Sequence, residues 1–232
     1  MGKRIWELDT LRGICILGMV LVHLLYNLDS MGILPTPAPV LFLQQWGGVF
    51  FLLISGICVT LGTHHVRRGL IVLGCGMLCT AVTAILFFLN MGSKDILIYF
   101  GILHCLGICM LLWGLLSRLP AWVLAVLGGL LSAAGLLVIP DIAVDTPWLI
   151  PLGFCPKGFT TADYFPLLPN LGYFLLGSAL GRLLYKAKRT RIPNTNTNHL
   201  LIRFLCGCGR HSLLIYLLHQ PVLMLVLSFL TR

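Results

Sequence analysis

Residues 9–28 read Asp9-Thr-Leu-Arg12-Gly-Ile-Cys-Ile-Leu-Gly-Met-Val-Leu-Val-His23-Leu-Leu-Tyr26-Asn27-Leu28, a segment long and apolar enough to span a bilayer as a helix. It nevertheless contains an arginine near one end and a histidine near the other. Ionisable side chains at membrane depth are costly, so they face a protein interior or a water-filled cavity. Arg12 and His23 share one helix face, about 16 Å apart along the axis. The pair fits a functional stripe, and it also fits a snorkelling arginine with a structural histidine.

The composition of the whole chain predicts a membrane protein. Hydrophobic residues make up 58% of the 232 positions and charged residues only 10%, and the mean hydropathy is +0.97. A soluble domain of this length cannot bury so much apolar surface. Glu7 and Asp9 precede the first apolar run, and no small-residue cleavage site follows it, so we expect a retained span and not a removed signal peptide. The predicted fold is all-α, a polytopic transmembrane helix bundle.

Seven apolar segments fit membrane spans: 9–28, 45–63, 70–90, 96–116, 121–139, 168–185 and 211–230. With the N-terminus placed in the cytosol, thirteen of the sixteen Lys and Arg residues fall on the inner side, as the positive-inside rule requires. The three on the outer side are Lys94, Lys157 and Arg232. The same assignment puts the connection 140–167 outside and a basic loop inside, followed by a short interfacial helix over 199–209. We expect a multi-pass protein of the inner or plasma membrane, in contact with lipid and not with nucleic acid.

The nine cysteines predict neither a disulfide framework nor a metal site. Eight lie in or beside apolar runs, where free cysteine behaves as a small hydrophobic residue. Cys155 falls in the outer connection without a partner on the same side. Cys206 and Cys208 have the wrong spacing for a zinc knuckle and no matching second pair. No metal cofactor is therefore expected.

Three histidines are expected inside the bundle: His23, His104 and His219. Any one of them alone could be a structural residue. Three in one small bundle, with Arg12 on the same face as His23, point to chemistry, because imidazole can accept a proton near neutral pH or act as a nucleophile. The basic inner side suits an anionic cytosolic ligand, although ordinary positive-inside topology explains it equally well.

Five stretches of the chain together resemble a known family. They are Leu8-Asp-Thr-Leu-Arg12-Gly-Ile with His23, Phe51-Leu-Leu-Ile-Ser55-Gly56, Phe100-Gly-Ile-Leu-His104-Cys-Leu-Gly107, Asp163-Tyr-Phe-Pro-Leu-Leu-Pro169 running into Gly172-Tyr-Phe-Leu-Leu-Gly177, and Ser212-Leu-Leu-Ile-Tyr216-Leu-Leu-His219-Gln220-Pro221. The first resembles the opening helix of the acyltransferase-three membrane acyltransferases. Taken together and in this order, the stretches are similar to the heparan-α-glucosaminide N-acetyltransferase catalytic-domain family in its compact bacterial form.

The resemblance implies one transmembrane acyltransferase domain over residues 1–232. Its implied reaction moves an acetyl group from cytosolic acetyl-CoA to an amino sugar or other glycan acceptor on the extracytoplasmic side. In the lysosomal members the position matching His23 is asparagine, and transfer is attributed to a histidine in the first outer loop. This chain has no histidine between residues 24 and 63, which leaves His23 and His104 as the catalytic candidates.

The remaining candidate residues follow from the side of the membrane on which they are expected and from their position in the chain. For acetyl-CoA binding near the inner side we expect Arg12, Asp9, Arg67, Arg68, Arg182 and Arg210, because arginine binds phosphate through a planar fork. For the acceptor we expect Tyr26, Asn27, Trp46, Asp163, Asn170, His219 and Gln220. Direct transfer and a transient acyl-histidine both remain open, as does assembly into a homo-oligomer.

Two other function classes fit the same stripe of histidine and arginine. A small proton-coupled transporter could use it as a proton relay, but the sequence shows no inverted repeat and no pair of interrupted helices. A non-catalytic membrane scaffold is the third interpretation. Thioester hydrolysis by the purified protein separates the enzyme from both alternatives.

Overall fold

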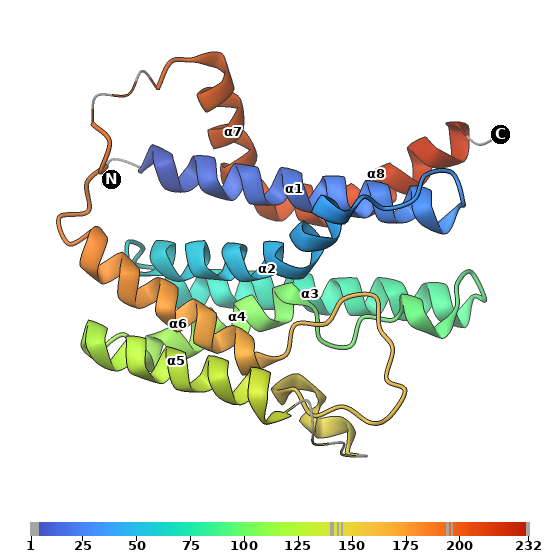
Figure 1. Cartoon of the computed structure of the whole chain (residues 1–232), viewed down its shortest axis with the longest axis horizontal. Coiled ribbons are helices and arrows are strands. Elements are labelled where there is room, and N and C mark those ends of the chain that lie inside the picture. Colours follow the sequence, from blue (N-terminus) through green and yellow to red (C-terminus); the bar gives the residue numbers. More distant parts are fainter. Residues whose placement is uncertain are drawn as a thin grey trace. The chain divides into compact units, whose positions relative to one another are not determined.

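The computed structural model describes residues 5–139, 142, 144, 146–193, 195 and 197–230, so Arg232 lies outside the described residues. These residues form helices joined by loops, of which the longest precede and follow α6 (Figure 1). In chain order the helices are α1 (Trp6–Ser30), α2 (Ala38–Val59), α3 (His65–Phe88), η1 (Lys94–Ile96), α4 (Ile102–Leu116), α5 (Ala121–Leu137), η3 (Pro147–Leu152), α6 (Leu167–Leu184), α7 (Leu200–Arg210) and α8 (Ser212–Leu230). The predicted all-helical fold class is confirmed for this part of the chain.

Each of the seven predicted spans contains one helix, and α7 occupies the place of the predicted short helix. Among the residues that the structure describes, five helices are long and apolar enough to cross a membrane, namely α1, α2, α3, α6 and α8. The helices α4 and α5 are apolar but shorter, with 15 and 17 residues. A multi-pass membrane protein follows from these helices. Seven as the exact number of spans, and a cytosolic N-terminus, stay predictions.

The largest boundary difference lies before α4, which begins at Ile102 and not near residue 96. The chain ahead of it pairs with a later segment through an isolated bridge between Phe100 and Tyr164. The carboxylate of Asp163 accepts a hydrogen bond from the Ile102 backbone N–H at 3.1 Å. This satisfies one of the N–H groups that a helix start leaves without an internal partner. The apolar run from Ile96 to Leu116 hides the break, since it has no charged residue or proline to mark it.

Two compact units make up the chain, and each is described by itself. The described parts of Met1–Ile54 and Ala187–Arg232 form the first unit, and Ser55–Lys186 forms the second. In the first unit α7 crosses α1 in direct backbone contact, because Gly13 lies against the Leu205 backbone and Gly209 against the Asp9 backbone. The helices α1 and α8 run parallel, since contacts along both chains occur in the same order, from Arg12 with Ser212 to Asn27 with Gln220.

In the second unit the helices pack as neighbours with small residues between them. The helices α5 and α6 are close at Gly172, where an added Cβ would collide with Ser132. The helices α2 and α6 are close at Gly56, beside the backbone of Phe174. Small residues of this kind allow close helix contact within a bilayer.

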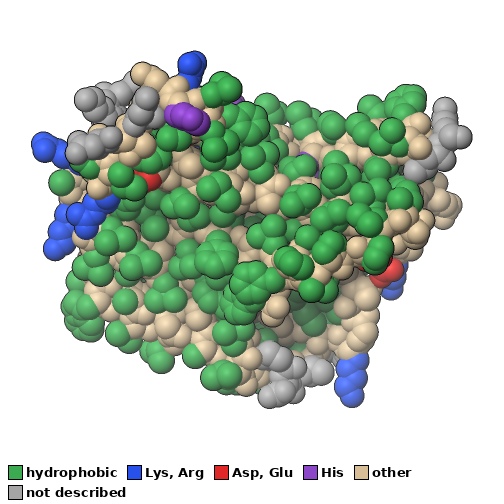
Figure 2. Space-filling model, turned by 45° about the horizontal axis from the view of Figure 1, so that its top comes forward, with side chains coloured by type: hydrophobic (Ala, Val, Ile, Leu, Met, Phe, Trp, Pro, Cys, Tyr) green, Lys and Arg blue, Asp and Glu red, His purple; other side chains and the backbone are tan. Residues whose placement is uncertain are grey.

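Apolar side chains cover most of the helix surface in the view of Figure 2. Phe88, Trp122 and Leu137 are among the large apolar side chains that are mostly exposed. Exposed apolar surface on this scale would favour aggregation in water, and lipid removes that cost. The surface therefore agrees with the membrane-protein class.

Candidate active site

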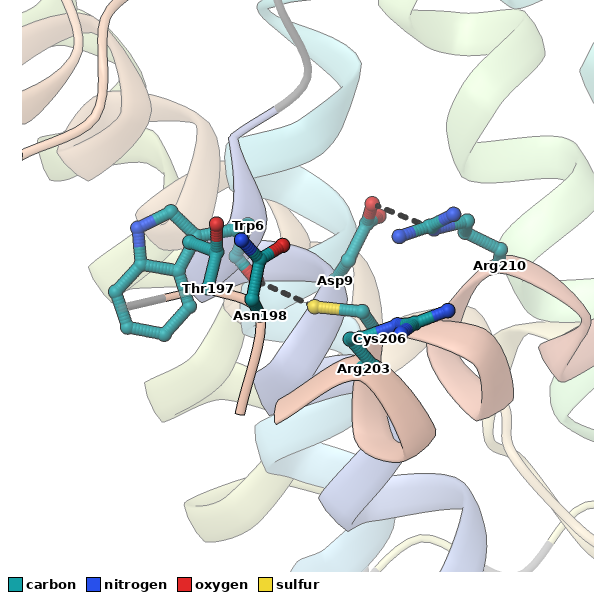
Figure 3. A pocket seen from close by; sticks show the side chains of 7 residues that line it. All are labelled: Trp6, Asp9, Thr197, Asn198, Arg203, Cys206 and Arg210. Carbon is teal, nitrogen blue, oxygen red and sulfur yellow. Dashed lines mark hydrogen bonds and ion pairs between the residues drawn. The ribbon is translucent and has the colours of Figure 1, made fainter. Parts of the chain in front are cut away.

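A pocket of about 380 Å³ lies where the first turns of α1 meet α7 (Figure 3). From α1 it is lined by Trp6 and Asp9, and from α7 by Arg203, Cys206 and Arg210. The three α7 residues are spaced at i, i+3 and i+7, which places them on one face of that helix. All five belong to the first unit. We call this cavity the α1–α7 pocket.

The charges in the α1–α7 pocket favour an anion. Asp9 forms an ion pair with Arg210, with Nε and Oδ2 3.6 Å apart. The Arg203 backbone N–H donates to the His199 carbonyl at 3.0 Å, and its guanidinium has no ion-pair partner within the described part of the chain. The pocket thus presents two guanidinium groups against one carboxylate. Arginine in such a setting is well suited to a phosphate group.

The walls of the α1–α7 pocket are held in place by specific bonds. The Cys206 thiol donates to the Trp6 carbonyl at 3.4 Å, and its sulfur lies 3.2 Å from Thr10 Oγ1. The buried Glu7 accepts hydrogen bonds from Thr190 Oγ1 at 2.8 Å and from the Arg191 backbone N–H at 2.7 Å. Charge-assisted bonds of this kind fix the basic loop onto the start of α1.

A second polar group lies further along α1, where four side chains meet. The rings of His23 and His219 have centroids 4.7 Å apart. One turn away, Gln220 Nε2 donates to Asn27 Oδ1 at 3.2 Å. We call these four residues the histidine cluster. It joins α1 to α8 within the first unit, and it brings together four residues that the sequence nominated separately.

The histidine cluster leaves three buried polar atoms without a protein partner: Asn27 Nδ2, His219 Nε2 and Gln220 Oε1. Asn27 as a whole is only 5% exposed. A buried polar group without a hydrogen bond is destabilising, and native proteins contain few of them. Three in one cluster indicate a place that a polar ligand or water occupies.

Arg12 lies between the α1–α7 pocket and the histidine cluster along α1. Its Nη2 donates to Ser212 Oγ at 2.8 Å. That bond uses one of the five N–H groups of the guanidinium and leaves the others available to an anion. The expected stripe of Arg12 and His23 is therefore part of a longer series of polar residues on this helix.

His104 has a different environment, in the second unit. Its Nδ1 accepts from the Gly101 backbone N–H at 3.2 Å, and its Nε2 lies 3.3 Å from Thr80 Oγ1. Gly76 makes room for the ring, since an added Cβ there would lie 3.0 Å from Nδ1. Both ring nitrogens are occupied, as in a structural histidine. His104 belongs to the second unit and His23 to the first, and a catalytic role for His104 stays a prediction.

Several other candidates in the second unit bond to backbone. The Arg182 guanidinium donates to the carbonyls of Ser117 and Leu119, and it lies 5.2 Å from the Trp113 ring centroid. The carboxylate of Asp163 accepts from the start of α4. Asn170 Nδ2 donates to the Pro166 carbonyl at 2.8 Å. These contacts give each residue a structural role, and their predicted ligand roles stay predictions.

The last four candidates have fewer contacts. Arg67 and Arg68 lie exposed in the first turn of α3, in the second unit. In the first unit Tyr26 is 55% exposed, and the ring of Trp46 lies 6.4 Å from that of Phe42. The structure brings none of them into the α1–α7 pocket or the histidine cluster.

Trp6 and Arg203 are pocket residues that the sequence analysis did not nominate. The signal for Arg203 was present, because it lies seven positions before Arg210 and therefore on the same helical face. Trp6 has no comparable spacing to another candidate residue that would have indicated a role in the pocket. Only the crossing of α1 and α7 places it at the cavity.

Comparison with known families gives one match. The model of the heparan-α-glucosaminide N-acetyltransferase catalytic family matches residues 4–221, nearly the whole chain. The chain belongs to this family. No curated protein and no solved structure matches it. The family confirms the resemblance drawn from the sequence motifs and identifies the chain as a membrane acetyltransferase. Both the α1–α7 pocket and the histidine cluster lie within the matched residues.

Proposed function

We propose that the protein transfers an acetyl group from cytosolic acetyl-CoA to an amino sugar or other glycan on the extracytoplasmic side of the membrane. In this proposal the α1–α7 pocket faces the cytosol and binds the nucleotide end of the donor. His23 takes part in the transfer itself, near the other side. The protein is then a multi-pass enzyme of the inner or plasma membrane.

The observation that carries the proposal is that α1 contributes residues both to a pocket rich in arginine and to a pair of histidines. Asp9 lines the pocket and His23 belongs to the histidine cluster. His23 lies fourteen positions after Asp9, which corresponds to about 21 Å along a helix. That separation suits a ligand with a phosphate-rich end and a long arm that carries its reactive group. Acetyl-CoA has this form.

The residues of the α1–α7 pocket suit the nucleotide end of that donor. Arg203 and Arg210 supply planar N–H forks for phosphate oxygens. The Trp6 indole supplies a flat apolar face on which an adenine ring can stack. Arg12 extends the positive charge along α1 toward the histidine cluster. The acetyl thioester would then reach His23 within the bundle, away from bulk water, where side reactions with water are suppressed.

The direct test is acetyl transfer by the purified protein in detergent or nanodiscs. Acetyl-CoA labelled in the acetyl group is incubated with glucosamine and with neutral sugars, and both released thiol and acetylated sugar are measured. We expect thiol release that depends on protein and rises with the productive acceptor. If the folded protein binds acetyl-CoA but consumes no thioester with any acceptor, the proposal fails. Proton-coupled uptake by proteoliposomes would then favour the transporter.

We also expect the basic loop after α6 to be cytosolic, with the connection before α6 outside. Lys188→Cys and Lys157→Cys place a thiol on an exposed side chain of each. A membrane-impermeant maleimide applied to intact cells should label the Lys157 variant above the background of native cysteines. It should label the Lys188 variant only after permeabilisation. The reverse pattern would invert the proposed topology and the side on which the donor binds.

A further inference from the structure

We propose that His219 is the general base of acetyl transfer and that Asn27 and Gln220 hold the acceptor against it. This inference rests on the proposed function, and it assigns the proton-accepting role to a residue of α8. From the sequence, His219 was expected to be one of three buried histidines and to bind the acceptor, whereas His23 and His104 were the catalytic candidates.

The hydrogen bond of His219 to the backbone sets its tautomer. Its Nδ1 bonds to the Tyr216 carbonyl within the same helix. A carbonyl oxygen only accepts, so Nδ1 carries the ring proton and Nε2 of the neutral ring presents a lone pair. That Nε2 is buried and has no partner within the described residues. An oriented imidazole with a free lone pair is what a general base requires.

The two side-chain amides near His219, those of Asn27 and Gln220, offer a ligand one hydrogen-bond donor and one acceptor. Their mutual bond uses Gln220 Nε2 and Asn27 Oδ1, which leaves Asn27 Nδ2 as a free donor and Gln220 Oε1 as a free acceptor. A sugar hydroxyl both donates and accepts hydrogen bonds, and a neutral amine does the same. A sugar hydroxyl next to the reacting group can satisfy both amides at once, so the reacting group keeps its lone pair for the acetyl carbon and its proton for His219 Nε2. An apolar ligand would leave both buried atoms unpaired, which is a strong ground for discrimination.

His23 lies next to the proposed base, and within the described residues its ring is not tied to a backbone carbonyl as that of His219 is. Its ring is 4.7 Å from that of His219, which places the two imidazoles side by side at one reaction centre. His104 is unsuited to the base role, because both of its ring nitrogens already have partners. The arrangement therefore assigns His23 to the acetyl group and His219 to the acceptor.

The transfer step then balances as follows. The acceptor nitrogen or oxygen forms a bond to the acetyl carbonyl carbon, while its proton moves to His219 Nε2. The bond between that carbon and the donor atom breaks, and the electron pair leaves on the donor atom. The donor atom is the thioester sulfur in direct transfer, or a ring nitrogen of His23 if that residue carries the acetyl group. His219 returns its proton to the departing atom, which restores the neutral imidazole.

The test compares His219→Gln with His211→Gln, a change of the same kind at an exposed histidine outside the cluster. We expect His219→Gln to lower kcat with glucosamine by about 10²- to 10⁴-fold, with unchanged acetyl-CoA affinity. His211→Gln should keep the wild-type rate. Hydroxylamine attacks acyl groups without a general base, so transfer to hydroxylamine should fall by less than tenfold in His219→Gln.

A second variant keeps the inference testable if His219→Gln does not fold. Asn27→Ala should raise the KM for glucosamine by about three- to tenfold and leave acetyl-CoA affinity unchanged. Near-wild-type glucosamine transfer by folded His219→Gln overturns the inference, and so does an equal loss with glucosamine and hydroxylamine. In both cases the wild-type enzyme still transfers acetyl groups, so the proposed function stands. Absence of transfer by the wild-type protein overturns both.

Discussion

Replacing His23 with alanine should lower the rate of acetyl transfer by about 10²- to 10⁴-fold, because the substitution removes an imidazole from the reaction centre. Acetyl-CoA affinity should change little, since the α1–α7 pocket that binds the nucleotide end is three to four helical turns away. The effect should therefore be in kcat and not in the donor Kd. Single-turnover kinetics with labelled acetyl-CoA, together with a binding isotherm for each variant, measure the two quantities separately.

His104→Ala is the matched comparison for that experiment. It removes the same side chain from a site where Nδ1 accepts from the Gly101 N–H at the start of α4 and Nε2 lies 3.3 Å from Thr80 Oγ1 of α3. We expect it to lower the melting temperature, because it leaves the Gly101 N–H without its partner, and to retain turnover in the folded fraction. A folded His23→Ala variant with normal turnover, beside an inactive but folded His104→Ala, would move the reaction centre to the second unit.

The sequence predicted the helical fold well because the signal is strong and local. Apolar runs of about twenty residues leave few alternatives to a membrane-spanning helix. The boundaries were less predictable where the determining contact is distant. The start of α4 depends on Asp163, sixty-one positions beyond Ile102, and no pattern near Ile102 reveals that bond.

The candidate site shows the same division between local and distant information. Residues on α1 and α8 were nominated from their types and motifs, and in the structure His219 lies beside His23 and Gln220 donates to Asn27. Which histidine lies beside His23 could not be predicted, because the α1–α8 register depends on packing between segments almost two hundred residues apart. Arg182 shows what the sequence could not reveal. Its charge and position predict a phosphate ligand, which stays a prediction, and no local pattern indicates that its guanidinium donates to the turn after α4.

The second large effect is expected at Gly209, where α7 crosses α1. A Cβ at this position would collide with the Asp9 carbonyl and come within 3.0 Å of the Gly13 backbone nitrogen. Backbone atoms cannot move aside as a flexible side chain does, so Gly209→Ala must push α7 away from α1. Overpacking of this kind costs about 1–3 kcal/mol. It also separates Asp9 from Arg210 and opens the α1–α7 pocket. We expect a lower melting temperature and at least about a tenfold weaker acetyl-CoA affinity, a change of roughly 1.4 kcal/mol.

Gly207→Ala is the control for this prediction, since it makes the same chemical change on the same helix at a position with nothing within 4 Å. Alanine is the better helix former by about 1 kcal/mol, so this variant should be at least as stable as the wild type and bind acetyl-CoA normally. Arg203→Ala separates charge from geometry, because it removes a guanidinium from the pocket without moving α7. It should weaken acetyl-CoA binding at an unchanged melting temperature, with partial recovery in Arg203→Lys, which restores the charge but not the fork.

If Gly209→Ala and Arg203→Ala both bind acetyl-CoA like the wild type, the nucleotide end of the donor does not bind in the α1–α7 pocket.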